Sequence, residues 1–197
     1  TLYGSDGDDG FHPDVLGDLW ATGNIEVGAV DIIDGRGGTD TVSYFNAKKT
    51  DTFTPNGIQV NLAAGTVIDP GGNTDQLTNI ENINGTNFDD QIVGDIEANT
   101  LNGYDGNDTL EGGAGNDTLD GGGGSDILTG GEGADTFSFY HNNVQDGSYG
   151  NDIIMDFNPD EGDTIYYSYW NTTTETMMPG QPVQTLGETV GNPSVYF

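Results

Sequence analysis

A nine-residue unit repeats four times without a gap between residues 103 and 138. The four copies read GYDGNDTLE, GGAGNDTLD, GGGGSDILT and GGEGADTFS. Every copy has Asp at position six and an apolar residue at position eight. These residues are Asp108, Asp117, Asp126 and Asp135, and Leu110, Leu119, Leu128 and Phe137. A repeat this short is typical of a solenoid in which each unit contacts only its neighbours.

The unit divides into a turn and a short strand. Its glycine-rich first four positions can adopt positive φ angles and bring backbone carbonyl groups close together. The three residues after the Asp are strand formers with one apolar side chain that points inward. A turn and three strand residues bury nothing alone, so stacked units must share one thin core. Two units make a coil of 18 residues, with turns along two opposite edges, and the sequence therefore predicts an all-β solenoid.

The charge of the chain requires an external counterion. The 197 residues contain 33 Asp and Glu against 3 Lys and Arg, a formal net charge of −30, and residues 50–197 contain no Lys or Arg. Hydrophobic residues make up 32% of the chain, below the roughly 45–50% of ordinary globular proteins. Such a chain resists collapse through self-repulsion, so it is either disordered or folds with bound cations. Nucleic acids and anionic membranes are excluded as partners, because their phosphates require positive charge.

Several other classes of chemistry are also excluded. The chain has no cysteine, so disulfides and thiolate metal sites are absent. It has no apolar run of 18 residues, and residues 1–10 lack the basic and apolar regions of a signal peptide. We therefore expect neither membrane insertion nor a cleavable N-terminal signal. The two histidines, His12 and His141, are far apart, with no HExxH motif or nucleophile elbow, so we expect no enzyme activity.

The nine-residue phase extends upstream of residue 103. Units 85–93 and 94–102 keep it, with Asp90 and Asn99 at position six. Unit 35–43 fits with Asp40, unit 26–34 fits weakly, and unit 4–12 fits with Asp9. Residues 13–25 and 44–75 break the pattern and are predicted to be insertions. The predicted roll thus spans residues 1–138, with turns at 4–12, 26–43 and 76–138, and residues 139–197 form a C-terminal region.

Strand signals also occur outside the repeats. Ile58, Val60 and Leu62 alternate with polar residues, which predicts a strand, and Pro70–Asn73 predict a turn. Ile80 and Ile83 are expected to rejoin the stack. Ile153, Ile154, Phe157 and Ile165 predict one or two strands that cap the open end of the solenoid.

The repeat resembles the G-G-x-G-x-D-x-U-x motif of the RTX family. Copies 112–120, 121–129 and 130–138 match every defined position, and copy 103–111 departs only at Tyr104. The segments GADTFSFY and YGNDIIMDFNPDEGDTI resemble the C-terminal cap of RTX proteins. The resemblance implies a right-handed parallel β-roll that binds several Ca²⁺ ions between turns one coil apart.

The ligands that the resemblance implies are position-six carboxylates and backbone carbonyls. The carbonyls come from positions two and four of one turn and positions one and three of the turn one coil later. On one edge the set is Tyr104, Gly106, Asp108, Gly121, Gly123 and Asp126. On the other edge it is Gly113, Gly115, Asp117, Gly130, Glu132 and Asp135. Three further pairs are Asp90 with Asp108, Asn99 with Asp117, and Asp9 with Asp40. Coordination by oxygen alone suits Ca²⁺ better than Mg²⁺.

Two functions follow from the resemblance. The first is a calcium-binding module that the type I secretion machinery exports unfolded and that folds outside the cell as a scaffold. Residues 139–197 would then form its C-terminal capping and secretion-signal region. The second is a calcium-dependent carbohydrate-binding or adhesion module, attached to a polysaccharide-acting enzyme or an adhesin. The aromatic run Tyr166–Trp170 favours the second, because exposed aromatic rings stack on sugars. Ice binding is disfavoured, because the triplet Asn-Asp-Thr recurs only at 107–109 and 116–118.

Overall fold

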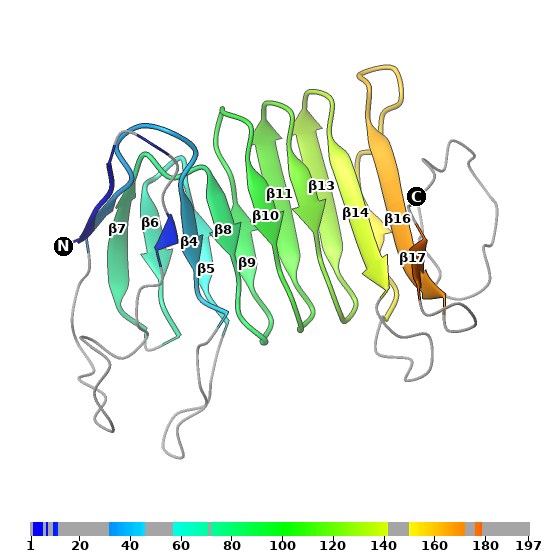
Figure 1. Ribbon diagram of the computed structural model, residues 1–197, viewed down its shortest axis with the longest axis horizontal. Coiled ribbons are helices and arrows are strands. Elements are labelled where there is room, and N and C mark those ends of the chain that lie inside the picture. Colours follow the sequence, from blue (N-terminus) through cyan, green and yellow to red (C-terminus); the bar gives the residue numbers. More distant parts are fainter. Residues whose placement is uncertain are drawn as a thin grey trace, which may run out of the picture.

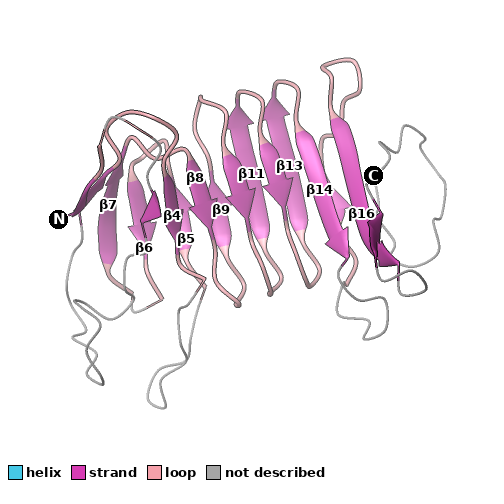
Figure 2. Ribbon diagram, in the orientation of Figure 1, coloured by secondary structure: helices cyan, strands magenta, loops and turns pink. Residues whose placement is uncertain are grey.

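The chain folds into two stacked β-sheets in a computed structural model (Figure 1). The structure describes residues 2–5, 7, 10–11, 32–45, 57–70, 72–141, 150–171 and 176–178. All regular elements among them are strands (Figure 2). No helix in this described part is long and apolar enough to cross a membrane.

The two sheets hold nine and eight strands. The order in the first sheet is β1 (Leu2–Tyr3), β3 (Ile32–Asp34), β7 (Thr74–Thr78), β6 (Thr66–Ile68), β5 (Gln59–Asn61), β9 (Gln91–Val93), β11 (Thr109–Ala114), β13 (Ile127–Glu132) and β15 (Ile153–Ile154). The order in the second is β17 (Thr176–Met178), β16 (Thr164–Asn171), β14 (Thr136–His141), β12 (Thr118–Asp120), β10 (Thr100–Asn102), β8 (Asn82–Asn84), β4 (Thr41–Ser43) and β2 (Gly10–Phe11).

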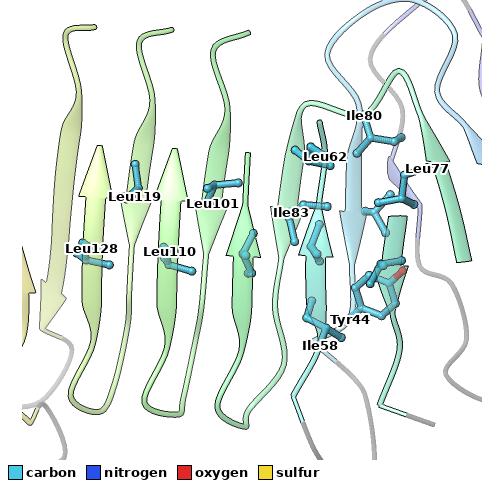
Figure 3. Packing of buried hydrophobic residues seen from close by; sticks show 14 of the residues in the cluster. Tyr44, Ile58, Leu62, Leu77, Ile80, Ile83, Leu101, Leu110, Leu119 and Leu128 are labelled. Carbon is cyan, nitrogen blue, oxygen red and sulfur yellow. The ribbon is translucent and has the colours of Figure 1, made fainter. Parts of the chain in front are cut away.

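Parallel pairing in the repeats follows the predicted 18-residue coil. Leu101 pairs with Leu119 in the second sheet, and Leu110 pairs with Leu128 in the first. These four side chains are fully buried and form two files between the sheets (Figure 3). Within the repeats, each strand contributes one buried position-eight side chain to the core between the sheets. This confirms the predicted all-β parallel roll.

The predicted insertion at 44–75 does not leave the roll over its described residues, which are 44–45, 57–70 and 72–75. β5, β6 and β7 form an antiparallel meander inside the nine-stranded sheet. β5 then pairs in parallel with β9, and β7 with β3. The meander fits because each of its strands buries alternate residues, including Val60, Val67 and Leu77. An antiparallel hairpin extends a sheet without completing a coil. The nine-residue period of the sequence therefore does not predict it.

Both sheets continue past Ser138. β15 pairs in parallel with β13, where Leu128 lies opposite Ile154. β16 pairs in parallel with β14, where Phe137 lies opposite Ile165. The expected capping strands therefore add one further rung to each sheet, and Phe157 packs against the same core.

Candidate metal centre

The turns of the roll stack along two opposite edges (Figure 2). The position-six residues belong to these turns. One edge carries turns 85–90, 103–108 and 121–126, and the other carries turns 94–99, 112–117 and 130–135. Position six lies two residues before the buried apolar residue of each strand, where the chain enters the sheet. All six side chains are at most 2% exposed. A buried carboxylate must be compensated by donors or cations, because burial removes its hydration.

One oxygen of each of these Asp side chains belongs to a ladder of hydrogen bonds. The backbone N–H of Asp90 donates to Asp108 Oδ1 at 2.7 Å, and that of Asp108 donates to Asp126 Oδ1 at 2.8 Å. On the other edge Asn99 N–H donates to Asp117 Oδ1 at 2.7 Å, and Asp117 N–H donates to Asp135 Oδ1 at 2.9 Å. Each carboxylate is therefore fixed by the turn one coil before it.

The ladder includes three residues that the sequence analysis did not assign. Asp152 Oδ1 and Asp163 Oδ1 accept the N–H groups of Asp126 and Asp135, both at 3.0 Å. Glu81 Oε2 accepts the N–H of Asp40 at 2.7 Å. A signal for the first two was present, because NDII and GDTI keep the D-x-U spacing. They were missed because the intervals of 26 and 28 residues break the 18-residue period.

The second oxygen of four of these Asp side chains has no donor. Among the described residues, no hydrogen bond reaches Oδ2 of Asp108, Asp117, Asp126 or Asp135, and all four atoms are buried. An unmet buried acceptor costs about 1–3 kcal/mol, and more when it is charged. Four such atoms in phase, two on each edge, indicate sites that take an external cation.

A backbone carbonyl approaches the same place. A Cβ built on Gly103 would collide with Asp108 Oδ2 and lie 2.6 Å from the carbonyl oxygen of Gly121. A Cβ on Gly112 would collide with Asp117 Oδ2 and lie 2.6 Å from the carbonyl oxygen of Gly130. The glycine at position one thus keeps open a cradle in which a carboxylate and a carbonyl of the next coil converge.

Positions two and four also bring carbonyls close. The carbonyl oxygens of Tyr104 and Gly106 lie against Gly122 and Gly124 one coil later, where a Cβ would collide with them. The same holds for Gly113 and Gly115, which face Gly131 and Gly133. These eight residues have φ between 75° and 140°, a region that glycine adopts without strain. Tyr104 is the only one of them with a side chain, and its φ is 75°.

The other predicted carbonyl ligands face the same turns. Gly123 O accepts Gly106 N–H at 2.8 Å, and Glu132 O accepts Gly115 N–H at 2.9 Å. Each carbonyl oxygen retains a second lone pair. The described residues contain no group of three or more His, Asp or Glu placed to hold a metal. Coordination here would therefore rest on carbonyls with one or two carboxylates, and this oxygen-only donor set suits Ca²⁺.

The remaining predicted pairs are placed differently. Asp40 is fully buried, and Asp9 lies outside the described residues. Asp90 and Asn99 stand in the ladder, but both accept donors from their own turns. The side chains of residues 167–170 also lie outside the described part, so the carbohydrate-binding alternative stays a prediction.

Burial raises the pKa of the carboxyl groups along both edges. Desolvation raises the pKa of Asp108 to about 8, and neighbouring carboxylates, Asp90 first, add to the rise. Desolvation likewise raises the pKa of Asp117 and Asp126 to about 6 and that of Asp152 to about 7. Asp120, at position nine, has a pKa raised to about 7 by burial and then by Asp126. Burial and the neighbouring carboxylates therefore disfavour the charged form of these groups.

Comparison with known families gives the ion its identity. A profile of the RTX calcium-binding nonapeptide repeat, in four copies, matches residues 84–119 and 102–137. Residues 84–137 belong to the RTX calcium-binding repeat family. The ions of these RTX repeats are Ca²⁺, several along the repeats, and the donorless carboxylates and converging carbonyls fit them.

The whole chain was also compared with curated proteins and with solved structures. No curated protein matches the chain. Among solved structures, the chain is similar to the extracellular lipase LipA from Serratia marcescens, with 22% sequence identity and a TM-score of 0.36. That match covers 83% of this chain and 31% of the lipase. The chain thus spans about a third of the length of that protein.

Proposed function

We propose that this chain is a calcium-responsive folding module without catalytic activity. The observation that carries the proposal is the row of four buried Asp Oδ2 atoms without a donor in the described structure. The chain bears a charge of −30, with no Lys or Arg from residue 50 onward. When the site is loaded, Ca²⁺ supplies the positive charge that these carboxylates lack. Its binding free energy then becomes folding free energy.

Two calcium sites are supported by complete sets of residues. On one edge Asp108 and Asp126 supply carboxylates, with the carbonyls of Tyr104, Gly106, Gly121 and Gly123. On the other edge Asp117 and Asp135 supply carboxylates, with the carbonyls of Gly113, Gly115, Gly130 and Glu132. The ladder fixes Oδ1 in each Asp and leaves Oδ2 for the ion, so the folded roll holds these side chains in one orientation.

The same dependence on calcium suits export by a type I secretion system. At the low calcium concentration of a cytosol, self-repulsion keeps the chain unfolded and able to pass an exporter. Extracellular calcium near 1 mM is in the range that binds calcium sites of extracellular modules, and the chain folds there as a scaffold. We therefore place the protein outside the cell, with the secretion machinery as its partner during export.

Export is tested in a bacterial host with and without a type I exporter. We expect full-length chain in the medium only when the exporter is present, and strand structure after the medium receives about 1 mM calcium. A cytosolic protein of similar mass, followed in the same culture, controls for lysis. Equal amounts of chain in the medium with and without the exporter would contradict this part of the proposal.

A further inference from the structure

Two turns of the roll satisfy their position-six side chain with their own donors. In turn 85–90, Thr86 N–H donates to Asp90 Oδ2 at 2.6 Å and Thr86 Oγ1 donates to Asp90 Oδ1 at 2.9 Å. Ile58 N–H adds a third bond, to Asp90 Oδ1 at 2.7 Å. Both oxygens of Asp90 are therefore occupied, whereas Oδ2 of Asp108 in the next turn on this edge has no donor in the described structure.

The neighbouring turn on the other edge is closed in the same way. Asp95 N–H donates to Asn99 Oδ1 at 2.8 Å, and Asn99 Nδ2 donates to the carbonyl of Glu81 at 2.9 Å. The amide nitrogen of Asn99 thus takes up a carbonyl of the preceding coil. A nitrogen that carries two hydrogens cannot coordinate a cation.

The cause lies at position two. Thr86 Oγ1 accepts Phe88 N–H at 3.0 Å, and Asp95 Oδ1 accepts Glu97 N–H at 2.9 Å. Ser, Thr, Asn and Asp side chains bind the N–H two residues later in this way and hold a local turn. That turn directs the position-two N–H toward position six. Neither Thr86 nor Asp95 is among the described non-glycine residues with positive φ.

In the four turns of the proposed calcium sites, which we call calcium-type turns, position two instead has a positive φ angle. Position two has φ of 75° at Tyr104, 112° at Gly113, 94° at Gly122 and 104° at Gly131. Tyr104 N–H points away from Asp108 and donates to Asn102 Oδ1 at 3.2 Å. Tyr104 is not glycine, yet no donor in the described structure reaches Asp108 Oδ2, and we call such a turn open. The turn is open because tyrosine has no short acceptor that could hold the N–H at position four. Its ring instead packs on Phe45, with centroids 4.4 Å apart.

We propose that the residue at position two decides which turns take calcium, and that Thr86 and Asp95 replace the ion in turns 85–90 and 94–99. This inference rests on the proposed function and narrows it. Calcium then enters only between pairs of open turns, and the pairs Asp90 with Asp108 and Asn99 with Asp117 carry no ion. The next coil would already supply a carbonyl to the first pair, because Gly103 O lies 2.9 Å from a Cβ built on Gly85. The side chain of Thr86 is what prevents binding there.

The test restores a calcium-type turn. In Thr86→Gly with Phe88→Gly, turn 85–90 regains glycine at positions two and four. Native mass spectrometry of the full chain in calcium should show one more bound ion than the wild type. The same double variant with Asp90→Asn is the control, and it should show no additional ion. An unchanged ion count in the double variant, or a gain that persists in the control, would overturn the inference.

A second comparison keeps the inference testable if the double variant does not fold. In the otherwise wild-type chain, Asp90→Asn should leave the number of bound calcium ions unchanged, and Asp108→Asn should lower it by one. Loss of an ion in Asp90→Asn would show that the closed turn binds calcium after all. A wild-type chain that binds no calcium would instead refute the proposed function, so the two failures are distinguishable.

Discussion

Replacing Asp117 by Asn is expected to lower the calcium affinity of its edge on the order of 100-fold. The loss of an outer-shell partner of a metal already costs up to about 100-fold, and Asp117 is a proposed direct ligand. Asp117 Oδ1 accepts the N–H of Asn99, so Asn at this position would keep its oxygen there. Its Nδ2 would then occupy the place of Oδ2, which is the atom left for the ion. The substitution removes one negative charge and puts two N–H donors against a cation.

Calorimetric titration with calcium measures this effect, and Asp105→Asn is the matched control. Asp105 lies in the neighbouring turn on the opposite edge and is exposed, so its substitution changes the net charge equally and leaves the carboxylates and carbonyls of the Asp117 edge in place. The control should bind calcium about as the wild type does, since exposed charges contribute little. Equal affinities for both variants would show that net charge, and not Asp117, determines binding.

Acidification is expected to stabilise the folded state in the absence of calcium. The carboxyls with raised pKa keep their protons in the folded state up to about pH 6 for Asp117 and Asp126, about 7 for Asp152 and about 8 for Asp108. In the unfolded chain they release them near their ordinary value of 3.8. The folded state thus binds more protons between these limits. Its calcium-free stability is highest below about pH 4 and falls as the pH rises toward 8.

The measurement is circular dichroism of the calcium-free, dialysed chain between pH 8 and pH 4. We expect strand signal to increase as the pH falls, and apparent calcium affinity to weaken over the same range, because protons and calcium compete for the same oxygens. A sample at pH 8 in about 1 M salt, which screens charge to about 3 Å, is the control for general repulsion. An equal gain of strand signal in that sample would refute specific protonation.

Much of the roll follows from the sequence because the repeat itself specifies it. An apolar residue every nine positions fixes the file of buried side chains, since period and coil length together determine which strands pair. The period therefore predicts correctly that Leu110, Leu119 and Leu128 are buried. The Asp at position six follows in the same way, because a fixed interval from the buried residue puts it at the strand entrance.

The parts that escaped prediction depend on interactions that have no period. The meander β5–β7 is antiparallel, so its strands continue the sheet although its sequence does not follow the nine-residue period. Glu81 is the exception, because it stands in phase 18 residues before Asn99 but is Glu where the repeat has Asp. The closed turn at 85–90 depends on the hydroxyl of Thr86, which donates to Asp90 and accepts from Phe88. Local hydrogen bonds set the direction of a single peptide, and repeat statistics do not contain that information.

Calcium removal from the wild-type chain tests the central claim most directly. At pH 7.5 the dialysed chain should give the circular dichroism of an unordered polypeptide, and addition of about 1 mM calcium should produce the strand spectrum. Magnesium at the same concentration should not, because Mg²⁺ demands a stricter octahedral geometry and keeps its water. A strand spectrum that is unchanged when calcium is removed would contradict the account.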